Sequence, residues 1–141
     1  MRTDWRTSLQ RWRPTARWTL VALAIPALFL LLRSQVSADQ GVSASEAAAL
    51  IKGQTDLQLI DVRTEGEYRS GHLPGAKLIP VQEISDRLAE IDKHKPVLLY
   101  CRTGHRSGIA LRILQNSGFT QARHIAGGIN AWRSAGLSVT R

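Results

Sequence analysis

The sequence has only one cysteine, Cys101, in 141 residues. A single cysteine excludes a disulfide framework within the chain and any zinc site built from several cysteines. Aromatic residues are also scarce, at 6% of the chain, and residues 39–141 contain no internal repeat. Hydrophobic residues make up 43% and charged residues 21%, which is the composition of a globular protein and not of a disordered one.

Acidic residues are few, and the resulting positive charge is unevenly distributed. The chain has 19 Lys+Arg against 11 Asp+Glu, a formal net charge of +8, which by itself suggests a nucleic-acid or membrane-surface partner. Residues 1–38 hold six arginines and one acid, a net of +5, and residues 39–141 hold the remaining 13 basic and 10 acidic residues, a net of +3. Because residues 39–141 show no basic stripe interleaved with aromatic residues, we expect no nucleic-acid binding.

Residues 1–38 form a basic leader that contains a hydrophobic run. The fifteen residues at 18–32 carry no charge and would span roughly 22 Å as a helix, whereas a membrane helix usually needs about 17–25 apolar residues. The run therefore fits a signal peptide, with the small residues Val36-Ser37-Ala38 allowing cleavage after Ala38. Arg33, directly after the run, fits a short uncleaved anchor instead. Both interpretations stay open at this point.

The orientation of this leader is better defined. Five arginines precede the run and little positive charge follows it, which keeps the N-terminus in the cytoplasm. Residues 39–141 are then exported, and we expect a periplasmic domain or one anchored to the inner membrane on its periplasmic side. Residues 18–32 are the only expected membrane contact, and only if they are retained. A buried core helix and a mitochondrial transit peptide are the remaining alternatives.

Residues 39–141 alternate between patterns typical of strands and of helices. Short apolar runs predict strands at 57–62, 76–79, 97–100 and 122–125, with a turn-rich stretch across 66–75. Helices are predicted from the capping-box pattern at Ser43 to Lys52, at 109–114 and at 129–135. A further helix is predicted after Pro80, where Ile84, Leu88 and Ile91 recur at helical spacing, and Lys95-Pro96 ends it. This alternation predicts a single α/β domain with a mostly parallel central sheet flanked by helices. Ligands of such folds bind at the carboxyl ends of the strands, which directs attention to residue 101.

The cysteine loop, which we define as Cys101–Gly108, joins the most apolar strand to a helix. Consecutive backbone N–H groups and the positive end of the helix dipole stabilise an anion at such a position, so we expect a thiolate with a pKa lowered from about 8.5 to about 3.5–7.5. Gly104 allows the loop to curl, and Arg102 and Arg106 supply cations that can grip an oxyanion. A buried, inert Cys101 is the alternative, but these neighbours are poor core material.

Three groups of residues stand in order along the predicted domain. The first comprises Asp61-Val62-Arg63, Glu67-Tyr68 and Gly71–Ala76, the second is the cysteine loop, and the third comprises Gly118-Phe119, Ala126–Ile129 and Trp132. Together they resemble the rhodanese (thiosulfate sulfurtransferase) family, over about residues 43–136. The resemblance is to a small, single-domain, exported type of rhodanese.

The resemblance implies a sulfurtransferase that works through a Cys101 persulfide. Cys101 would take a sulfane sulfur from thiosulfate or a similar anionic donor and pass it to cyanide or a thiol. The substrate-binding residues would be Arg102, Thr103, Gly104, His105 and Arg106, and the supporting residues Asp61, Arg63 and Ser107. No metal or organic cofactor is expected, and the protein is expected to be a monomer. The alternative is a persulfide carrier or a partner-binding module that does not turn over thiosulfate and cyanide.

The length of the cysteine loop separates two chemistries within this resemblance. Family members that act on phosphate or arsenate have five residues between the cysteine and the arginine. Four residues separate Cys101 from Arg106 here. The resemblance therefore favours sulfur transfer over a phosphatase or an arsenate reductase.

Overall fold

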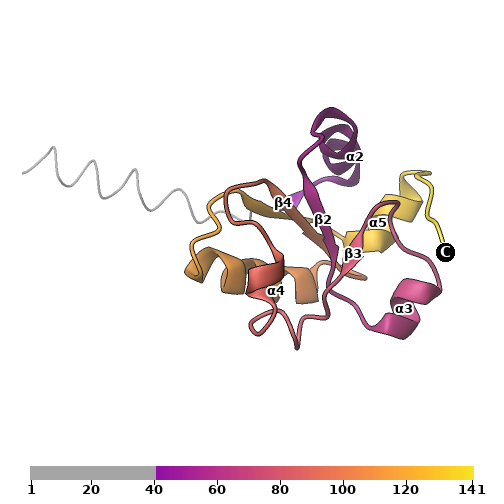
Figure 1. Cartoon of the computed structure of the whole chain (residues 1–141). Coiled ribbons are helices and arrows are strands. Elements are labelled where there is room, and N and C mark those ends of the chain that lie inside the picture. The colour runs from indigo at the N-terminus through magenta and orange to yellow at the C-terminus, as the bar shows by residue number, and fades with distance from the viewer. Residues whose placement is uncertain (1–40) are drawn as a thin grey trace, which may run out of the picture. The chain divides into compact units, whose positions relative to one another are not determined.

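The computed structural model describes residues 41–141, which build one five-stranded sheet with the order β1-β5-β4-β2-β3 (Figure 1). Every neighbouring pair of strands is parallel, which confirms the predicted α/β architecture. The strands are β1 (Gly41–Val42), β2 (Gln58–Asp61), β3 (Lys77–Leu78), β4 (Val97–Tyr100) and β5 (Ala122–Ile125). The helices are α2 (Ala44–Gly53), α3 (Glu65–Arg69), α4 (His105–Asn116) and α5 (Gly128–Ser134), with a short 3-10 helix, η2, at Leu88–Glu90.

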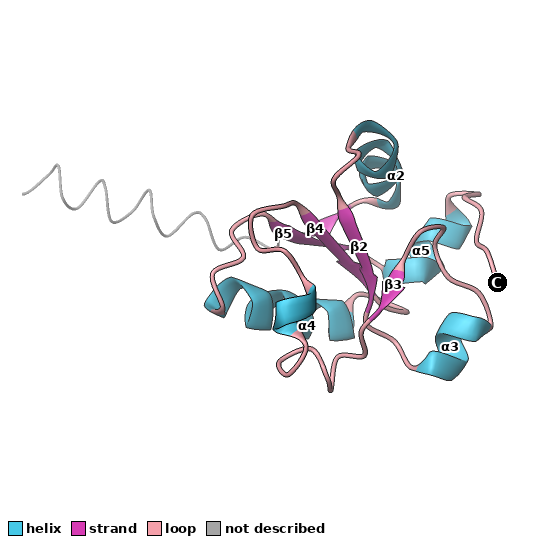
Figure 2. Ribbon diagram, in the orientation of Figure 1, coloured by secondary structure: helices cyan, strands magenta, loops and turns pink. Residues whose placement is uncertain are grey.

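Successive residues of β4 pack into different layers of the core because side chains alternate between the faces of a strand. Leu99 and Cys101 belong to the cluster that contains the buried residues of α4, whereas Leu98 and Tyr100 belong to the cluster that contains Trp132 of α5. Helix α4 therefore covers one face of the sheet, and α2 and α5 cover the other (Figure 2). All four residues of β4 are buried, as expected for a central parallel strand.

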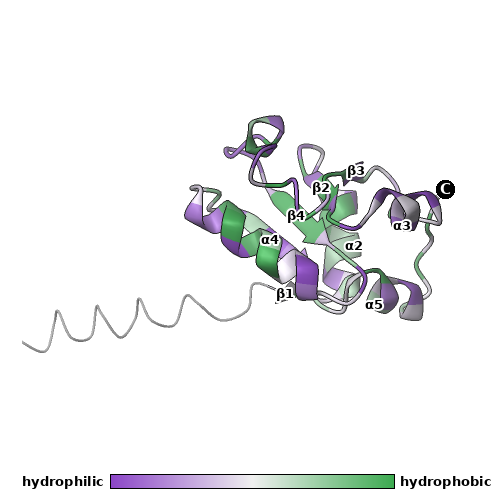
Figure 3. Ribbon diagram, turned by 90° about the horizontal axis from the view of Figure 1, so that it is seen from below, coloured by the Kyte–Doolittle hydropathy of each residue, from purple (hydrophilic) through white to green (hydrophobic). Residues whose placement is uncertain are grey.

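Helix α4 packs one side against the sheet and turns the other to solvent. Ala110, Leu111 and Leu114 are buried against the sheet, while Arg112 is exposed. Figure 3 shows the corresponding green and purple bands along α4, next to strands that are mostly green. The helix is amphipathic, and its N-terminal end lies next to Cys101 at the edge of the core.

The capping box predicted at the start of α2 is present. Ser43 Oγ accepts the Glu46 N–H at 3.2 Å, and the Glu46 carboxylate accepts the Ser43 N–H at 2.8 Å. A second capping box, formed by Thr64 and Glu67, begins α3, in a stretch for which the sequence analysis expected only turns. The Thr-x-x-Glu pattern is the sequence signal for this helix, although the glycines at 66 and 71 favour turns.

The helix predicted between Pro80 and Lys95 is wrong. The segment is a series of tight turns, in which the N–H groups of Glu83, Asp86 and Ile91 each donate to the carbonyl three residues earlier, and only Leu88–Glu90 forms a helix, of the 3-10 type. Ile84 and Ile91 are nevertheless buried. The apolar spacing therefore predicted correctly that these side chains are buried. Successive turns, and not a regular helix, bring them to the core.

The predicted signal peptide or anchor, including the apolar run at 18–32, lies outside the described residues and stays a prediction. Among residues 41–141 no helix has the length and apolar character needed to cross a membrane.

Candidate active site

The Cys101 side chain follows β4 directly and is 1% exposed. Helix α4 begins four residues later, after Gly104, whose φ of 101° lies in the left-handed region. This conformation turns the loop back over the sulfur. As a result the Gly104 N–H donates a hydrogen bond to Cys101 Sγ at 3.1 Å. The Ser107 hydroxyl lies 3.6 Å from the same sulfur. The local chain thus surrounds one sulfur atom with hydrogen-bond donors.

These donors change the acidity of the thiol. Burial of the Cys101 side chain raises the pKa of the thiol, but hydrogen bonds from the N–H and hydroxyl of Ser107 and from the N–H groups of Thr103 and Gly104 outweigh burial. The net result is a Cys101 pKa below its ordinary value. The arrangement favours a thiolate, which is the nucleophilic form of cysteine.

The start of α5 holds the cysteine loop from the other side. The Ile129 N–H donates to the Cys101 carbonyl at 2.8 Å, and the Asn130 N–H donates to the Arg102 carbonyl at 3.2 Å. A Cβ on Gly128 would lie 2.3 Å from the Cys101 carbonyl oxygen and 2.7 Å from the Arg102 carbonyl carbon. Glycine at 128 is therefore what permits the close approach of α5 to the loop.

Arg106 is paired with Glu67. Its Nη1 and Nη2 each donate to one Glu67 carboxylate oxygen at 2.7 Å, although 39 residues separate the two in sequence. The hydrogen bond from Arg106 is the main reason that the pKa of Glu67 falls to about 2, and the Thr64 N–H and hydroxyl add to the effect against the opposing effect of burial. Arg106 thus connects the cysteine loop to α3. The exposed Arg102 has no ion-pair partner among residues 41–141.

Asp61 and Arg63 form a buried ion pair at the end of β2. Arg63 Nη2 lies 2.6 Å from Asp61 Oδ2 and also donates to the Gly71 carbonyl at 2.8 Å. Tyr100 Oη accepts the Leu73 N–H at 3.1 Å, and burial raises the Tyr100 pKa. These contacts join the ends of β2 and β4 to the turn at residues 71–73. Tyr100, the last residue of β4, directly precedes Cys101. Asp61 and Arg63 support the strand ends and have no recorded contact with the sulfur.

The other predicted binding residues differ in what they offer. The side chains of Thr103 and His105 are exposed, and Thr103 acts on the sulfur through its N–H. Ser107 is fully buried, and its Oγ lies 3.0 Å from the Gly104 carbonyl and 3.2 Å from Nδ1 of His124 in β5. The sequence analysis gave His124 no part in the site. Its contact with Ser107 depends on how β5 lies beside β4, and local sequence contains no signal for it.

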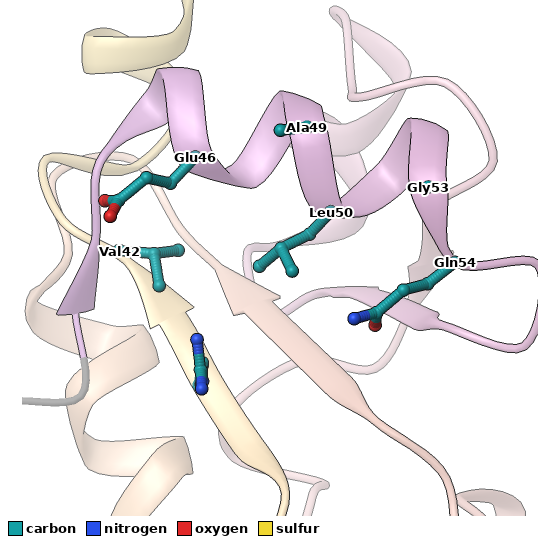
Figure 4. A pocket seen from close by; sticks show the side chains of 7 residues that line it. Val42, Glu46, Ala49, Leu50, Gly53 and Gln54 are labelled. Atoms are coloured by element: carbon teal, nitrogen blue, oxygen red, sulfur yellow. The ribbon is translucent and has the colours of Figure 1, made fainter.

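A groove of about 430 Å³ lies elsewhere, between α2 and the β1–β5 edge of the sheet (Figure 4). Its lining contains Leu50, Gln54 and Glu46, but no residue of the cysteine loop. Glu46 is engaged in the capping box of α2. No cluster of three or more His, Cys, Asp or Glu side chains suited to a metal ion occurs within residues 41–141.

The family of rhodanese-like domains matches residues 43–135. A sulfurtransferase of Allochromatium vinosum is 38% identical over 84 residues, which cover 60% of this chain and 78% of that protein. Thiosulfate sulfurtransferase PspE of Escherichia coli is 40% identical over 70 residues, 48% of this chain and 67% of PspE. The uncharacterized protein YqhL of Bacillus subtilis is 41% identical over 80 residues, and the match spans 64% of its length and 57% of this chain.

Solved structures show the same fold. A rhodanese-like domain protein from Staphylococcus aureus superimposes with a TM-score of 0.63 at 31% identity, and the match covers 72% of this chain and 98% of that protein. A rhodanese-related protein from Thermoplasma volcanium superimposes with a TM-score of 0.65 at 25% identity, over 71% of this chain and 96% of that protein. With a family match over most of residues 41–141 and the cysteine loop at its expected place, the chain belongs to the family of rhodanese-like domains.

Proposed function

We propose that this protein is a sulfurtransferase that moves a sulfane sulfur from thiosulfate, or a similar anionic donor, to a thiophilic acceptor through a persulfide on Cys101. The observation that carries the proposal is the single thiol of the chain, held with a lowered pKa by the donors of the cysteine loop. Similarity to sulfurtransferases of Allochromatium vinosum and Escherichia coli supports the same reaction class.

The first step is an attack by the Cys101 thiolate on the outer sulfur of thiosulfate. A new S–S bond forms to Cys101 while the S–S bond of thiosulfate breaks, and sulfite leaves with the electron pair. The persulfide that remains carries one negative charge, as the thiolate did. The N–H groups of Thr103, Gly104 and Ser107 stabilise the thiolate, and we expect them to stabilise this anion as well.

The second step returns the thiolate. Cyanide, or a thiolate acceptor, attacks the terminal sulfur of the persulfide, the persulfide S–S bond breaks, and Cys101 regains the electron pair. With cyanide the product is thiocyanate. Because the chain has no second cysteine, the acceptor must come from outside.

The arginines of the loop divide two tasks in this proposal. Arg106 is held by both oxygens of Glu67 and positions the loop against α3. The exposed Arg102 is the side chain that attracts the dianionic donor, together with the dipole at the start of α4. His105 is exposed at the first residue of α4 and adds a polar group on the donor's side.

The proposed place of action is outside the cytoplasm. The support is in the sequence: five arginines before an uncharged run at 18–32, followed by small residues at 36–38. The domain would then act in the periplasm, either released or anchored on the outer side of the inner membrane.

The test uses the full-length chain, incubated with thiosulfate and weighed by intact-protein mass spectrometry before and after addition of cyanide. We expect a gain of one sulfur atom, its loss to cyanide as thiocyanate, and no gain in Cys101→Ser. Protein alkylated at Cys101 beforehand is the matched control and should gain nothing. A gain of sulfur that persists in Cys101→Ser overturns the proposal. A persulfide that forms but transfers only to protein thiols, and not to cyanide, identifies the carrier function instead.

A further inference from the structure

His124 is a buried polar side chain that the reaction described above does not use. It lies in β5 opposite Leu99 of β4 and is 7% exposed. Its Nδ1 is 3.2 Å from Ser107 Oγ. A Cβ on either Gly104 or Gly108 would lie 3.9 Å from its Cε1, so the imidazole faces the first turn of α4. The ring therefore lies beside the turn that carries the donors to the sulfur.

Ser107 has one hydroxyl proton and three neighbours that could accept it. These are Cys101 Sγ at 3.6 Å, the Gly104 carbonyl at 3.0 Å and His124 Nδ1 at 3.2 Å. The Gly104 carbonyl also accepts the Gly108 N–H at 2.9 Å, but its second lone pair can still accept the hydroxyl. The sulfur therefore shares the hydroxyl proton with this carbonyl, and with the imidazole nitrogen wherever that nitrogen can accept.

The protonation of His124 Nδ1 decides whether the imidazole competes with the sulfur for this proton. If Nδ1 is bare, it competes with the sulfur for the single hydroxyl proton. If Nδ1 carries a proton, it donates to Ser107 Oγ, which is then free to donate its own proton to the sulfur. The second arrangement removes Nδ1 as a competitor, so more of the hydroxyl proton is available to the Cys101 anion.

We propose that His124 is a positioning residue for the Cys101 sulfur: its Nδ1–H donates to Ser107 Oγ and directs the Ser107 hydroxyl proton onto Sγ. The chain of contacts runs from β5 through α4 to the end of β4, and it acts on the thiolate and on the persulfide that replaces it. The inference rests on the proposed function only for the persulfide, because the effect on the thiolate exists without any sulfur donor. The hydrogen bond from the Ser107 side chain is one of the causes of the lowered Cys101 pKa, which agrees with this direction of donation.

The test measures the Cys101 pKa from the pH dependence of its alkylation by iodoacetamide, which reports one thiol because the chain has one. We expect His124→Leu, which has no N–H donor, to raise the thiol pKa by about one pH unit, the size expected for loss of one hydrogen bond to an anion. His124→Asn, whose amide N–H can donate to Ser107, should keep the thiol pKa within a few tenths of a unit of wild type. Ser107→Ala should raise the pKa as His124→Leu does.

The double variant Ser107→Ala/His124→Leu separates action through Ser107 from general damage to the site. We expect its thiol pKa to equal that of Ser107→Ala alone. The proposal is overturned if His124→Leu leaves the pKa unchanged, if it raises the pKa equally in the Ser107→Ala background, or if His124→Asn behaves like His124→Leu. Folding is checked by circular dichroism, and His124→Met, which also lacks a donor, replaces His124→Leu if the latter does not fold.

The alkylation readout also keeps this inference apart from the proposed function. If the wild-type protein takes no sulfur from thiosulfate while the pKa shifts appear as expected, the function is overturned and the role of His124 stands. If sulfur transfer proceeds but the pKa shifts are absent, the proposed function stands and the role of His124 is overturned.

Discussion

The four α-helices of residues 41–141 begin in two different ways. Helices α2 and α3 begin with capping boxes, in which Ser43 with Glu46 and Thr64 with Glu67 occupy the first N–H groups. Helices α4 and α5 begin after glycines in the left-handed conformation, Gly104 and Gly127, and have no side-chain cap. The first pair is closed by its own side chains, and the second pair is left open.

The open helix starts are those that surround Cys101. At α4 the donors act on the sulfur, and at α5 the N–H groups of Ile129 and Asn130 hold the carbonyls of Cys101 and Arg102. A polar side chain at either N-cap would compete for these N–H groups. The closed helix starts therefore stabilise the fold, whereas the open starts hold the cysteine loop and lower the pKa of the Cys101 thiol.

The largest expected effect comes from filling the open start of α5. In Gly128→Ala the new Cβ would lie 2.3 Å from the Cys101 carbonyl, so α5 and the cysteine loop must separate. We expect the free energy of unfolding to fall by about 3 kcal/mol or more, from the steric clash together with the strained backbone. Chemical denaturation followed by circular dichroism measures it.

Gly136→Ala is the matched control for this variant. Gly136 has a φ of 72°, close to the 57° of Gly128, but a Cβ there would meet nothing within 4 Å. Its expected cost is only the backbone strain, about 1 kcal/mol. Equal losses in the two variants would show that close approach to the cysteine loop does not matter.

An intermediate effect is expected at Glu67, which belongs to a closed helix start and also holds the open one through Arg106. Glutamine at this position still caps α3 but removes the charge that pairs with Arg106. We expect Glu67→Gln to lower the free energy of unfolding by about 1 kcal/mol near pH 6, because the ion pair is only partly buried. Because the Glu67–Arg106 ion pair should also hold the cysteine loop in place, persulfide formation should be slower in Glu67→Gln than in wild type.

The stabilisation that Glu67 contributes should depend on pH in one direction. The Glu67 pKa is about 2 in the folded protein against an ordinary 4.5, so the unfolded chain binds more protons between these values. The contribution is fully present above about pH 4.5 and is lost as the pH falls towards 2, where wild type and Glu67→Gln should converge. Glu46→Gln is the control, because Glu46 caps α2 and its pKa is lowered mainly by Ser43, with only a smaller effect from the charge of Arg123. If the difference in unfolding free energy between wild type and Glu67→Gln persisted unchanged to pH 2, it would not come from the Glu67–Arg106 ion pair.

The smallest functional effect is expected at the closed start of α2. Ser43→Ala removes the cap on the Glu46 N–H and should lower the free energy of unfolding by about 1 kcal/mol. The Cys101 thiol pKa should stay at its wild-type value. Ser45→Ala, at an exposed position inside the same helix, should cost nothing, because alanine is the better helix former. A changed thiol pKa in Ser43→Ala would break the division between the two kinds of helix start.

Local patterns predicted the parts of the fold that depend on neighbours in sequence. The capping box at Ser43 and the apolar run of β4 lie where the sequence analysis placed them, and Gly104 does curl the loop onto the sulfur. The segment after Pro80 was predicted as a helix because Ile84 and Ile91 recur at helical spacing. Burial of both residues was right and the helix was wrong, because spacing records which side chains face the core and not the hydrogen bonds that take them there.

The sequence by itself determined the single cysteine, the strand before it, the helix after it and the family to which the chain belongs. Only the tertiary structure decided the partners of the cysteine loop: Glu67 on Arg106, His124 beside Ser107, and Gly128 against the carbonyl of Cys101. Each of these contacts joins residues from different elements. Their distances follow from the register of the sheet and the packing of α3, α4 and α5, which no local pattern in the chain encodes.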